Sequence, residues 1–329
     1  LKDLAQLYLY DAQGRYQEIE ALLVRALAIC EQQLGPSHPE TGEALCELGL
    51  NYARQGEYLK AEPLYQRSLA ICVQIFGSTH QFTSIVVNNL GVLYELQGKY
   101  AEAEPFFLRS LTIGEQVFGS SHTRTATFIN DLATLYLLQG KYEEAEPLFL
   151  RALAIREQEL GPSHPVTAKS LNGLGLLYLE QEKGPEAESF LLRTLNIREQ
   201  QLGPSHPQTV STFHNLALLY AKQGKYEETE ALLDRSLYIK ALALVDEHLL
   251  TAKNLFSLAF LYLGQQAFLR AQQCYQQALA VLGKTLGLDH PQVAKCIERY
   301  TQLVSEQSKG ESEGAESRST MQSLMTNQE

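Results

Sequence analysis

Histidine, the most frequent metal ligand in proteins, recurs along this chain at a fixed interval. Seven of the eight histidines are spaced 42 residues apart: His38, His80, His122, His164, His206, His248 and His290. A zinc site needs three or four ligands that converge at about 2.0–2.1 Å, whereas equivalent residues of stacked units are separated by helix layers of about 8–10 Å each. The spacing therefore predicts no metal site, and we expect each histidine to help begin a helix and pack the joint between units.

The residue types that carry out catalysis are not arranged to do so here. The sequence has no GxSxG nucleophile motif, no paired carboxylates in a cleft pattern and no cluster with metal-ligand spacing. Gly283-Lys284-Thr285 is similar to the end of a phosphate-binding loop, but Ala278 stands where the first glycine is required and no strand precedes it. We therefore expect a protein that is not an enzyme and that has no cofactor.

Asparagine recurs in the first helix of several units, although it is a poor helix former. The positions six and five residues before a periodic tyrosine hold Asn88 and Asn89, Asn130 and Asp131, Asn172 and Gly173, and His214 and Asn215. An asparagine amide both donates and accepts hydrogen bonds, so a row of them can bind the N–H and C=O groups of an extended peptide. The alternative is a polar helix surface without a ligand.

Charge is distributed unevenly along the same helices. The earlier repeats carry Glu43, Glu47, Glu95 and Asp131 with Arg54, and the later ones carry Lys169, Lys222 and Lys253 with Glu180. Opposite charges across an interface favour association. We therefore expect a bound peptide to place acidic residues toward repeats four to seven, with Lys169, Lys222 and Lys253 as contacts.

These side chains must be positioned by a repeated pair of helices. In the copy from Thr83 to His122, apolar residues spaced three and four apart predict one helix before the Gln97-Gly98-Lys99 break and a second helix after it. The residue before each periodic histidine is Ser37, Thr79, Ser121, Ser163, Ser205, Glu247 or Asp289, and most of these are good N-caps. We therefore predict that the next helix begins at this residue.

Two further columns concern packing between units. Arginine recurs as Arg25, Arg67, Arg109, Arg151, Arg193 and Arg235, which predicts either a row of ion pairs between repeats or a solvated face. Glycine occupies the turn in most copies, at Gly14, Gly56, Gly98, Gly140 and Gly224, and is replaced by Glu182 in the fifth. Five cysteines without a CxxC pair indicate free thiols in a reducing compartment.

The side-chain sizes identify the type of repeat. A 42-residue helical pair fits either a HEAT or a tetratricopeptide (TPR) array. The pattern Leu48-Gly49-x-x-Tyr52 followed by Ala61-x3-Tyr65, repeated in later copies, favours the TPR, because its small residues let the two helices approach closely. The sequence therefore predicts an all-α right-handed superhelical solenoid of about seven 42-residue TPR units over residues 1–304, ending in a C-terminal capping helix. Residues 305–329 are expected to form a disordered tail rich in Ser, Glu and Gln.

Composition excludes several kinds of partner. A net charge of −11 and a pI near 5.3 argue against nucleic acid, which requires clustered Lys and Arg. No apolar run approaches the roughly 18 residues of a membrane helix, and the sequence shows no leader pattern. We expect a cytoplasmic protein without nucleic-acid or membrane partners, and the start at Leu1 within the repeat pattern indicates a trimmed fragment.

The repeat resembles the cargo-binding region of kinesin light chains and of their bacterial, particularly cyanobacterial, relatives. The likeness rests on Asn-Asn-Leu at 88–90, Gln-Gly-Lys-Tyr at 97–100, 139–142 and 223–226, Ala-Glu-Pro at 103–105 and 145–147, and Leu-Gly-Pro-Ser-His-Pro at 34–39, 160–165 and 202–207. It spans residues 1 to about 300, and the heptad segment that binds the heavy chain is absent. The resemblance implies that the asparagine row contacts peptide.

The sequence as a whole predicts a protein–protein interaction adaptor or scaffold that holds a peptide segment of a partner in a concave groove. Two alternatives remain. One is an architectural spacer that associates with itself or fills the groove with the residues around Met321. The other is a sensor module of a larger signalling protein.

Overall fold

The computed structural model describes residues 16–243, 255, 258–259, 262, 267–286, 297–298 and 301. His248, Lys253, His290 and the predicted tail lie outside these residues. The chain divides into two compact units, residues 1–212 and 213–329. The helices of the first unit are α2 (Tyr16–Gln33), α3 (Pro39–Arg54), α4 (Tyr58–Phe76), α5 (Gln81–Leu96), α6 (Tyr100–Phe118), α7 (Thr123–Leu138), α8 (Tyr142–Leu160), α9 (Thr167–Glu180) and α10 (Gly184–Leu202). Three more follow: α11 (Pro207–Lys222), which crosses the boundary, α12 (Tyr226–Ala243) and α14 (Phe268–Leu286).

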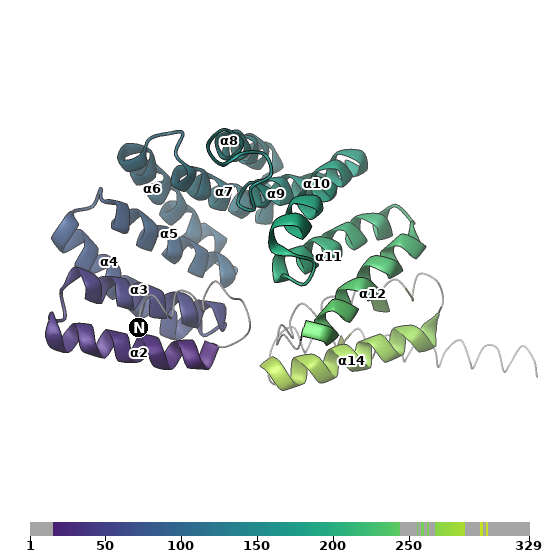
Figure 1. Cartoon of the computed structure of the whole chain (residues 1–329), viewed down its shortest axis with the longest axis horizontal. Coiled ribbons are helices and arrows are strands. Elements are labelled where there is room, and N and C mark those ends of the chain that lie inside the picture. Colours follow the sequence, from purple (N-terminus) through teal and green to yellow (C-terminus); the bar gives the residue numbers. More distant parts are fainter. Residues whose placement is uncertain are drawn as a thin grey trace, which may run out of the picture. The chain divides into compact units, whose positions relative to one another are not determined.

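The helices of the first unit form sequential antiparallel pairs, as the sequence predicts. Each odd-numbered helix from α3 to α9, called an A helix here, packs against the B helix that follows it. Successive A helices from α3 to α9 also contact one another. The A helices form the inner layer of this unit and α4, α6 and α8 lie outside them (Figure 1). The all-α solenoid is therefore confirmed.

Close approach within each pair depends on a small residue facing a large one. A Cβ atom added to Gly91 would lie 3.0 Å from the ring of Phe107, and one added to Gly49 would lie 3.0 Å from Tyr65. The same rings also pack against the next repeat, where Phe107 joins the core cluster of Leu132 and Leu135. The predicted role of the small positions is confirmed. The ring facing each of them closes its own pair and also packs against the next repeat.

The loop between repeats is held by histidine and threonine. Nδ1 of His122 accepts a hydrogen bond from the backbone N–H of Arg124 at 3.1 Å, which makes the histidine itself the N-cap. The same bond forms at His38, His80, His164 and His206. The prediction that the preceding Ser or Thr caps the helix is therefore wrong, because α3, α5 and α7 begin one residue later and α9 begins only at Thr167, after Val166. The predicted part of the histidine in beginning the next helix is confirmed at His38, His80 and His122, where the histidine is the N-cap.

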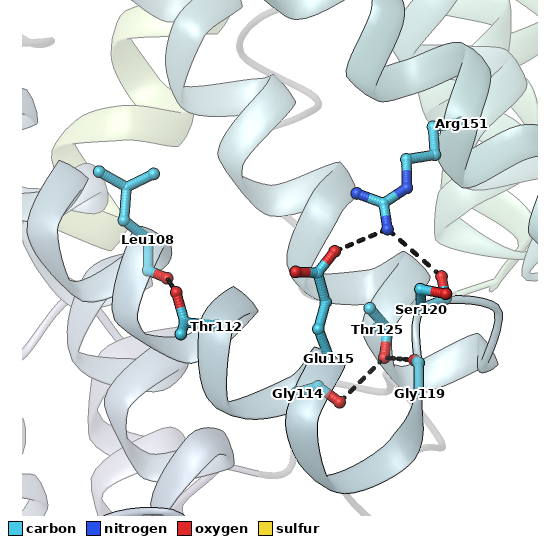
Figure 2. A network of polar contacts seen from close by, with 8 residues as sticks. All are labelled: Leu108, Thr112, Gly114, Glu115, Gly119, Ser120, Thr125 and Arg151. Carbon is cyan, nitrogen blue, oxygen red and sulfur yellow. Dashed lines mark hydrogen bonds and ion pairs between the residues drawn. The ribbon is translucent and has the colours of Figure 1, made fainter.

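A threonine three residues after each of these histidines fastens the same loop. Thr125 Oγ1 donates to the Gly119 carbonyl at 2.7 Å and to the Gly114 carbonyl at 3.3 Å (Figure 2). Equivalent bonds to the glycine that ends the preceding helix are made by Thr41, Thr83, Thr167 and Thr209. The loop glycine and the start of the next A helix are thus tied together in every described copy.

Two rows of side-chain contacts connect successive B helices to their neighbours. Arg151 contacts Glu115 at 2.6 Å and the Ser120 carbonyl at 3.4 Å (Figure 2). Arg67 and Glu31 form an equivalent pair at 2.6 Å. Arg193 and Glu157 form another. These pairs confirm the predicted ion-pair row. It is interrupted where Val73 replaces the glutamate opposite Arg109.

The second row joins the periodic tyrosine of each A helix to the preceding repeat. The hydroxyl of Tyr178 donates to Glu146 Oε1 at 2.8 Å, and burial raises the pKa of Tyr178 to about 12. The same bond forms between Tyr52 and Glu20, Tyr94 and Glu62, Tyr136 and Glu104, and Tyr262 and Glu230. Each tyrosine therefore fixes the spacing between its own A helix and the preceding B helix.

The turn inside the fifth pair keeps the shape of the others without their glycine. Glu182 has φ 60°, close to the φ 75° of Gly140 and the φ 73° of Gly98. A residue with a Cβ is strained in this left-handed region, although it loses less backbone entropy on folding than glycine does.

We predict that Glu182→Gly raises the free energy of unfolding by about 0.5–1 kcal/mol, because it removes this strain. Gly140→Ala is the matched control and should lower it by a similar amount, since a Cβ there meets no atom within 4 Å and only the backbone is strained. Urea unfolding measures both. A Glu182→Gly protein that is less stable than the wild type would contradict the interpretation.

Candidate functional site

The asparagines six residues before the periodic tyrosine, Asn88 and Asn130, are buried between repeats. Asn88 is 6% exposed, its Nδ2 donates to Asp131 Oδ2 at 2.8 Å, and its Oδ1 accepts from Ser110 Oγ at 3.2 Å. Asn130 is 9% exposed, and its Oδ1 accepts from Ser170 Oγ at 3.1 Å. These amide groups have hydrogen-bond partners on neighbouring helices, so they hold the A helices together beneath the surface of the inner layer.

A buried arginine completes the joint around Asn130. Arg156 is 1% exposed, and its Nη1 donates to Asn130 Oδ1 at 3.0 Å and to Ser170 Oγ at 2.7 Å. Burial lowers the pKa of Arg156 to about 10, so its guanidinium remains charged at neutral pH. Arg198, 42 residues later, donates to the Gln208 carbonyl and to Thr212 Oγ1, both at 2.8 Å. In earlier repeats Cys72 and Gly114 hold this position, so only later joints contain a cation.

The second asparagine position opens onto a cavity. Asn89 lies on α5, and its Nδ2 is 3.3 Å from Cys46 Sγ. Both residues line a cavity of about 550 Å³, a volume within the usual range for ligand sites. Its apolar lining includes Leu50, Phe82 and Ile85. The cavity is formed by α3, α4, α5, α7 and α9, so four successive repeats contribute to one concave site.

Charged residues from both halves of the first unit meet at this cavity. Its lining contains Glu43, Glu47 and Arg54 from α3, Arg124 from α7 and Lys169 from α9. The pKa of Lys169 is lowered, first by burial and then by the Arg156 charge, while Asp131 opposes the shift. The stacking therefore brings Lys169 of the fifth copy to the same cavity as Glu43 and Glu47 of the second.

Two carboxyl groups lie close together on neighbouring A helices. Burial raises the pKa of Glu95 to about 7, and the charge of Asp131 acts in the same direction. The pKa of Asp131 is also raised by burial, against the hydrogen bond from Asn88 and the charge of Arg156. At neutral pH Glu95 is therefore partly protonated.

The thiol in the cavity is not a nucleophile at neutral pH. Burial raises the pKa of Cys46 to about 12, and only the thiolate reacts. The described cysteines, Cys30, Cys46, Cys72 and Cys274, form no disulfide. Within the described part of the chain no group of His, Cys, Asp and Glu could hold a metal ion. None of the described helices is long and apolar enough to span a bilayer.

The remaining candidate residues lie outside the cavity. Asn172 is half-buried on α9, and His214, Asn215 and Lys222 lie on α11 in the second unit. Asn215 is 8% exposed and Lys222 is exposed. Lys253 lies outside the described residues. Of the eight candidates among the described residues, only Asn89 and Lys169 line this cavity.

The sequence interpretation did not identify several residues of the cavity as one site. Arg124 and Phe82 occupy the same position in successive A helices, 42 residues apart, and this spacing was a usable signal. The buried partners of the asparagines, Ser110 and Ser170, lie on a B helix and on the next A helix. Their contacts depend on how the repeats stack, which spacing alone does not give.

With this geometry the class of protein follows. The sequence profile described as tetratricopeptide repeat matches residues 1–72, 47–116, 82–158, 123–200, 174–240 and 208–284. The chain therefore belongs to the tetratricopeptide repeat family, whose members typically mediate protein–protein interactions. A search of curated proteins gave no match.

Solved structures with similar folds include kinesin light chain-like proteins. BtubC (BKLC) from P. vanneervenii is 24% identical over 70% of this chain and 92% of its own, with a TM-score of 0.55. A kinesin light chain-like protein of nearly identical TPR-like repeats from Podosopora anserina is 25% identical over 62% of this chain and 96% of its own, with a TM-score of 0.51. Cut9–Hcn1 of the APC/C aligns over 85% of this chain and 46% of its own at 15% identity, with a TM-score of 0.60. BtubC and Cut9–Hcn1 support the fold alone.

We predict that Asn130→Ala and Asn89→Ala have different effects on stability. Asn130→Ala leaves the buried Arg156 guanidinium and Ser170 short of an acceptor and should lower the free energy of unfolding by about 1–3 kcal/mol. Asn89→Ala is the matched control and should change it by less than about 0.5 kcal/mol. Chemical unfolding of both variants measures the difference. Equal losses would show that the two positions are alike.

We predict that Glu95→Gln stabilises the protein mainly above neutral pH. A carboxyl group whose folded pKa is raised above its unfolded value contributes stability below the unfolded pKa and loses it as pH rises through the folded pKa. For Glu95 this window runs from the ordinary value of 4.5 to about 7. The variant should therefore gain about 3 kcal/mol over the wild type at pH 8 and little at pH 4.5. Measuring the free energy of unfolding of both proteins from pH 4.5 to 8 tests this prediction. A difference between them that does not change with pH would contradict it.

Proposed function

We propose that this protein is a non-catalytic adaptor that binds an extended peptide segment of a partner protein in the cavity on its A-helix layer. The single observation that carries the proposal is this cavity of about 550 Å³, which four consecutive repeats build from apolar and charged side chains. A partner segment that crosses several A helices would bury apolar side chains over Leu50, Phe82 and Ile85. Family membership supports a protein ligand.

The polar contacts to the peptide are assigned to candidate residues that line the cavity. We propose Asn89 as a hydrogen-bonding contact and Lys169 with Arg124 as partners for acidic side chains of the ligand. Asn88 and Asn130 hold the A helices that present these residues. Asn172 and His214 repeat the position of Asn88 and Asn130. In the second unit Asn215 repeats the position of Asn89, and we extend the proposal to Asn215 and to Lys222. Lys253 would serve in the same way.

The relation to kinesin light chains is part of the proposal. The BtubC (BKLC) and Podosopora anserina structures share the repeat arrangement, and the second is 25% identical. Their common feature with this chain is the TPR-like repeat fold. We infer that this chain likewise binds a peptide segment of a partner protein. The fold does not identify that partner.

We predict that a variant with both Lys169→Glu and Arg124→Glu loses partner binding, because acidic side chains would meet like charges. Affinity capture from a lysate of the source organism, at low and at raised salt, compares it with the wild type. The wild type should retain a defined protein whose capture weakens with salt, and the variant should not.

The matched control for this experiment carries the same change in charge away from the cavity. Lys99→Glu with Lys183→Glu alters two lysines that lie over Tyr94 and Tyr178 and do not line the cavity. This control should capture the same protein as the wild type. Identical capture by all three proteins would contradict a role for the cavity.

A further inference from the structure

One position of the A helix changes its chemistry from repeat to repeat across the cavity. Residues 42 apart at this position are Glu43 on α3, Ile85 on α5, Thr127 on α7 and Lys169 on α9. Glu43, Ile85 and Lys169 all line the cavity. Thr127 Oγ1 lies 3.4 Å from Arg156 Nη2 and accepts a hydrogen bond from it. The same structural position therefore passes from acidic through apolar to basic along the stack.

Neighbouring side chains strengthen each part of this series. Glu47 follows Glu43 by one helical turn and also lines the cavity. Phe82 lies one turn before Ile85, so the middle of the series is apolar. Arg124 occupies the corresponding place on α7, where its guanidinium lies 5.7 Å from the centre of the Phe118 ring. Two carboxylates thus mark one end of the series and two cations mark the other.

A third cation of the lining, Arg54, is eleven residues after Glu43 on α3, which at 1.5 Å per residue places it about 16 Å further along the helix axis. Its charge is one of those that lower the pKa of Lys169, so Arg54 acts together with Lys169 and belongs to the basic part of the lining. An extended segment that crosses the N-terminal halves of the A helices would meet the two ends of the series first.

We propose that the cavity binds an extended segment that carries charges of both signs, with a basic residue against Glu43 and Glu47, an apolar residue over Phe82 and Ile85, and an acidic residue against Arg124 and Lys169. This inference rests on the proposed function and adds the chemistry of the ligand and its order along the groove. Opposite charges at the two ends also fix the direction of the segment, because the reversed segment would place like charges together at both ends. A purely acidic segment would meet repulsion at Glu43 and Glu47.

Selection from a displayed library of random 12-residue peptides on the whole chain tests this chemistry. Peptides that bind the wild type should contain a basic and an acidic residue flanking an apolar one. Changing the basic residue of a selected peptide to Glu should weaken its binding by about tenfold, and Glu43→Lys should restore it. Changing the acidic residue to Lys should have the same effect, and Lys169→Glu should restore binding. If Glu43→Lys fails to fold, Glu43→Gln replaces it in the test. This variant removes the negative charge without reversing it, and it should abolish the preference for a basic residue in the peptide.

Each outcome bears on a different part of the account. This inference would be overturned if the selected peptides were acidic only. It would also be overturned if the effect of their basic residue on affinity were the same in the wild type and in the Glu43 variants. Either result would leave the proposed function standing. Peptides whose basic residue couples to Lys169 would overturn the order. Failure of the folded protein to retain any peptide would overturn the proposed function as well.

Discussion

The close approach of the A and B helices in each pair is the constraint on which the rest of the structure depends. A Cβ on Gly49 or Gly91 would lie only 3.0 Å from the ring of Tyr65 or Phe107, and these rings are at most 1% exposed. Because a ring that closes one pair also packs against the next A helix, a single choice of residue sizes sets both the pair and the stack. The repeat is stable only as part of an array, since one pair alone leaves its apolar face uncovered.

Polar contacts then fix the spacing that the apolar core allows. The tyrosine–glutamate bonds, the arginine–glutamate pairs and the histidine and threonine bonds in the loops recur with the same register in the described repeats. They occupy the helix ends and the outer layer. The A-helix surface is left to vary from repeat to repeat, and Glu43, Ile85 and Lys169 differ at one equivalent position. A binding site of defined chemistry can therefore arise on a regular scaffold.

Much of this fold follows from the spacing of residue types. The 42-residue period, the apolar stripes and the small residues at 49 and 91 are local features, so they predict the helix pairs and the type of repeat. The starts of α3, α5 and α7 are displaced by one residue because a histidine serves as the cap in place of the usual serine or threonine. The five threonines of the loops have the same period and could have been found. The roles of Asn88 and Asn130 could not, because Asp131 and Arg156 reach them only through the stacking of repeats.

The cavity could not be predicted from spacing either, since Lys169 and Glu43 line it together only because the repeats of the first unit stack along a curve. Site-specific photocrosslinking tests its role directly. A benzophenone amino acid in place of Phe82, which lines the cavity, is compared with one in place of Leu59, which is 90% exposed on α4, in a lysate of the source organism. The account predicts a discrete protein adduct from position 82 and none from position 59. An adduct from position 59 alone, or from neither position, would contradict it.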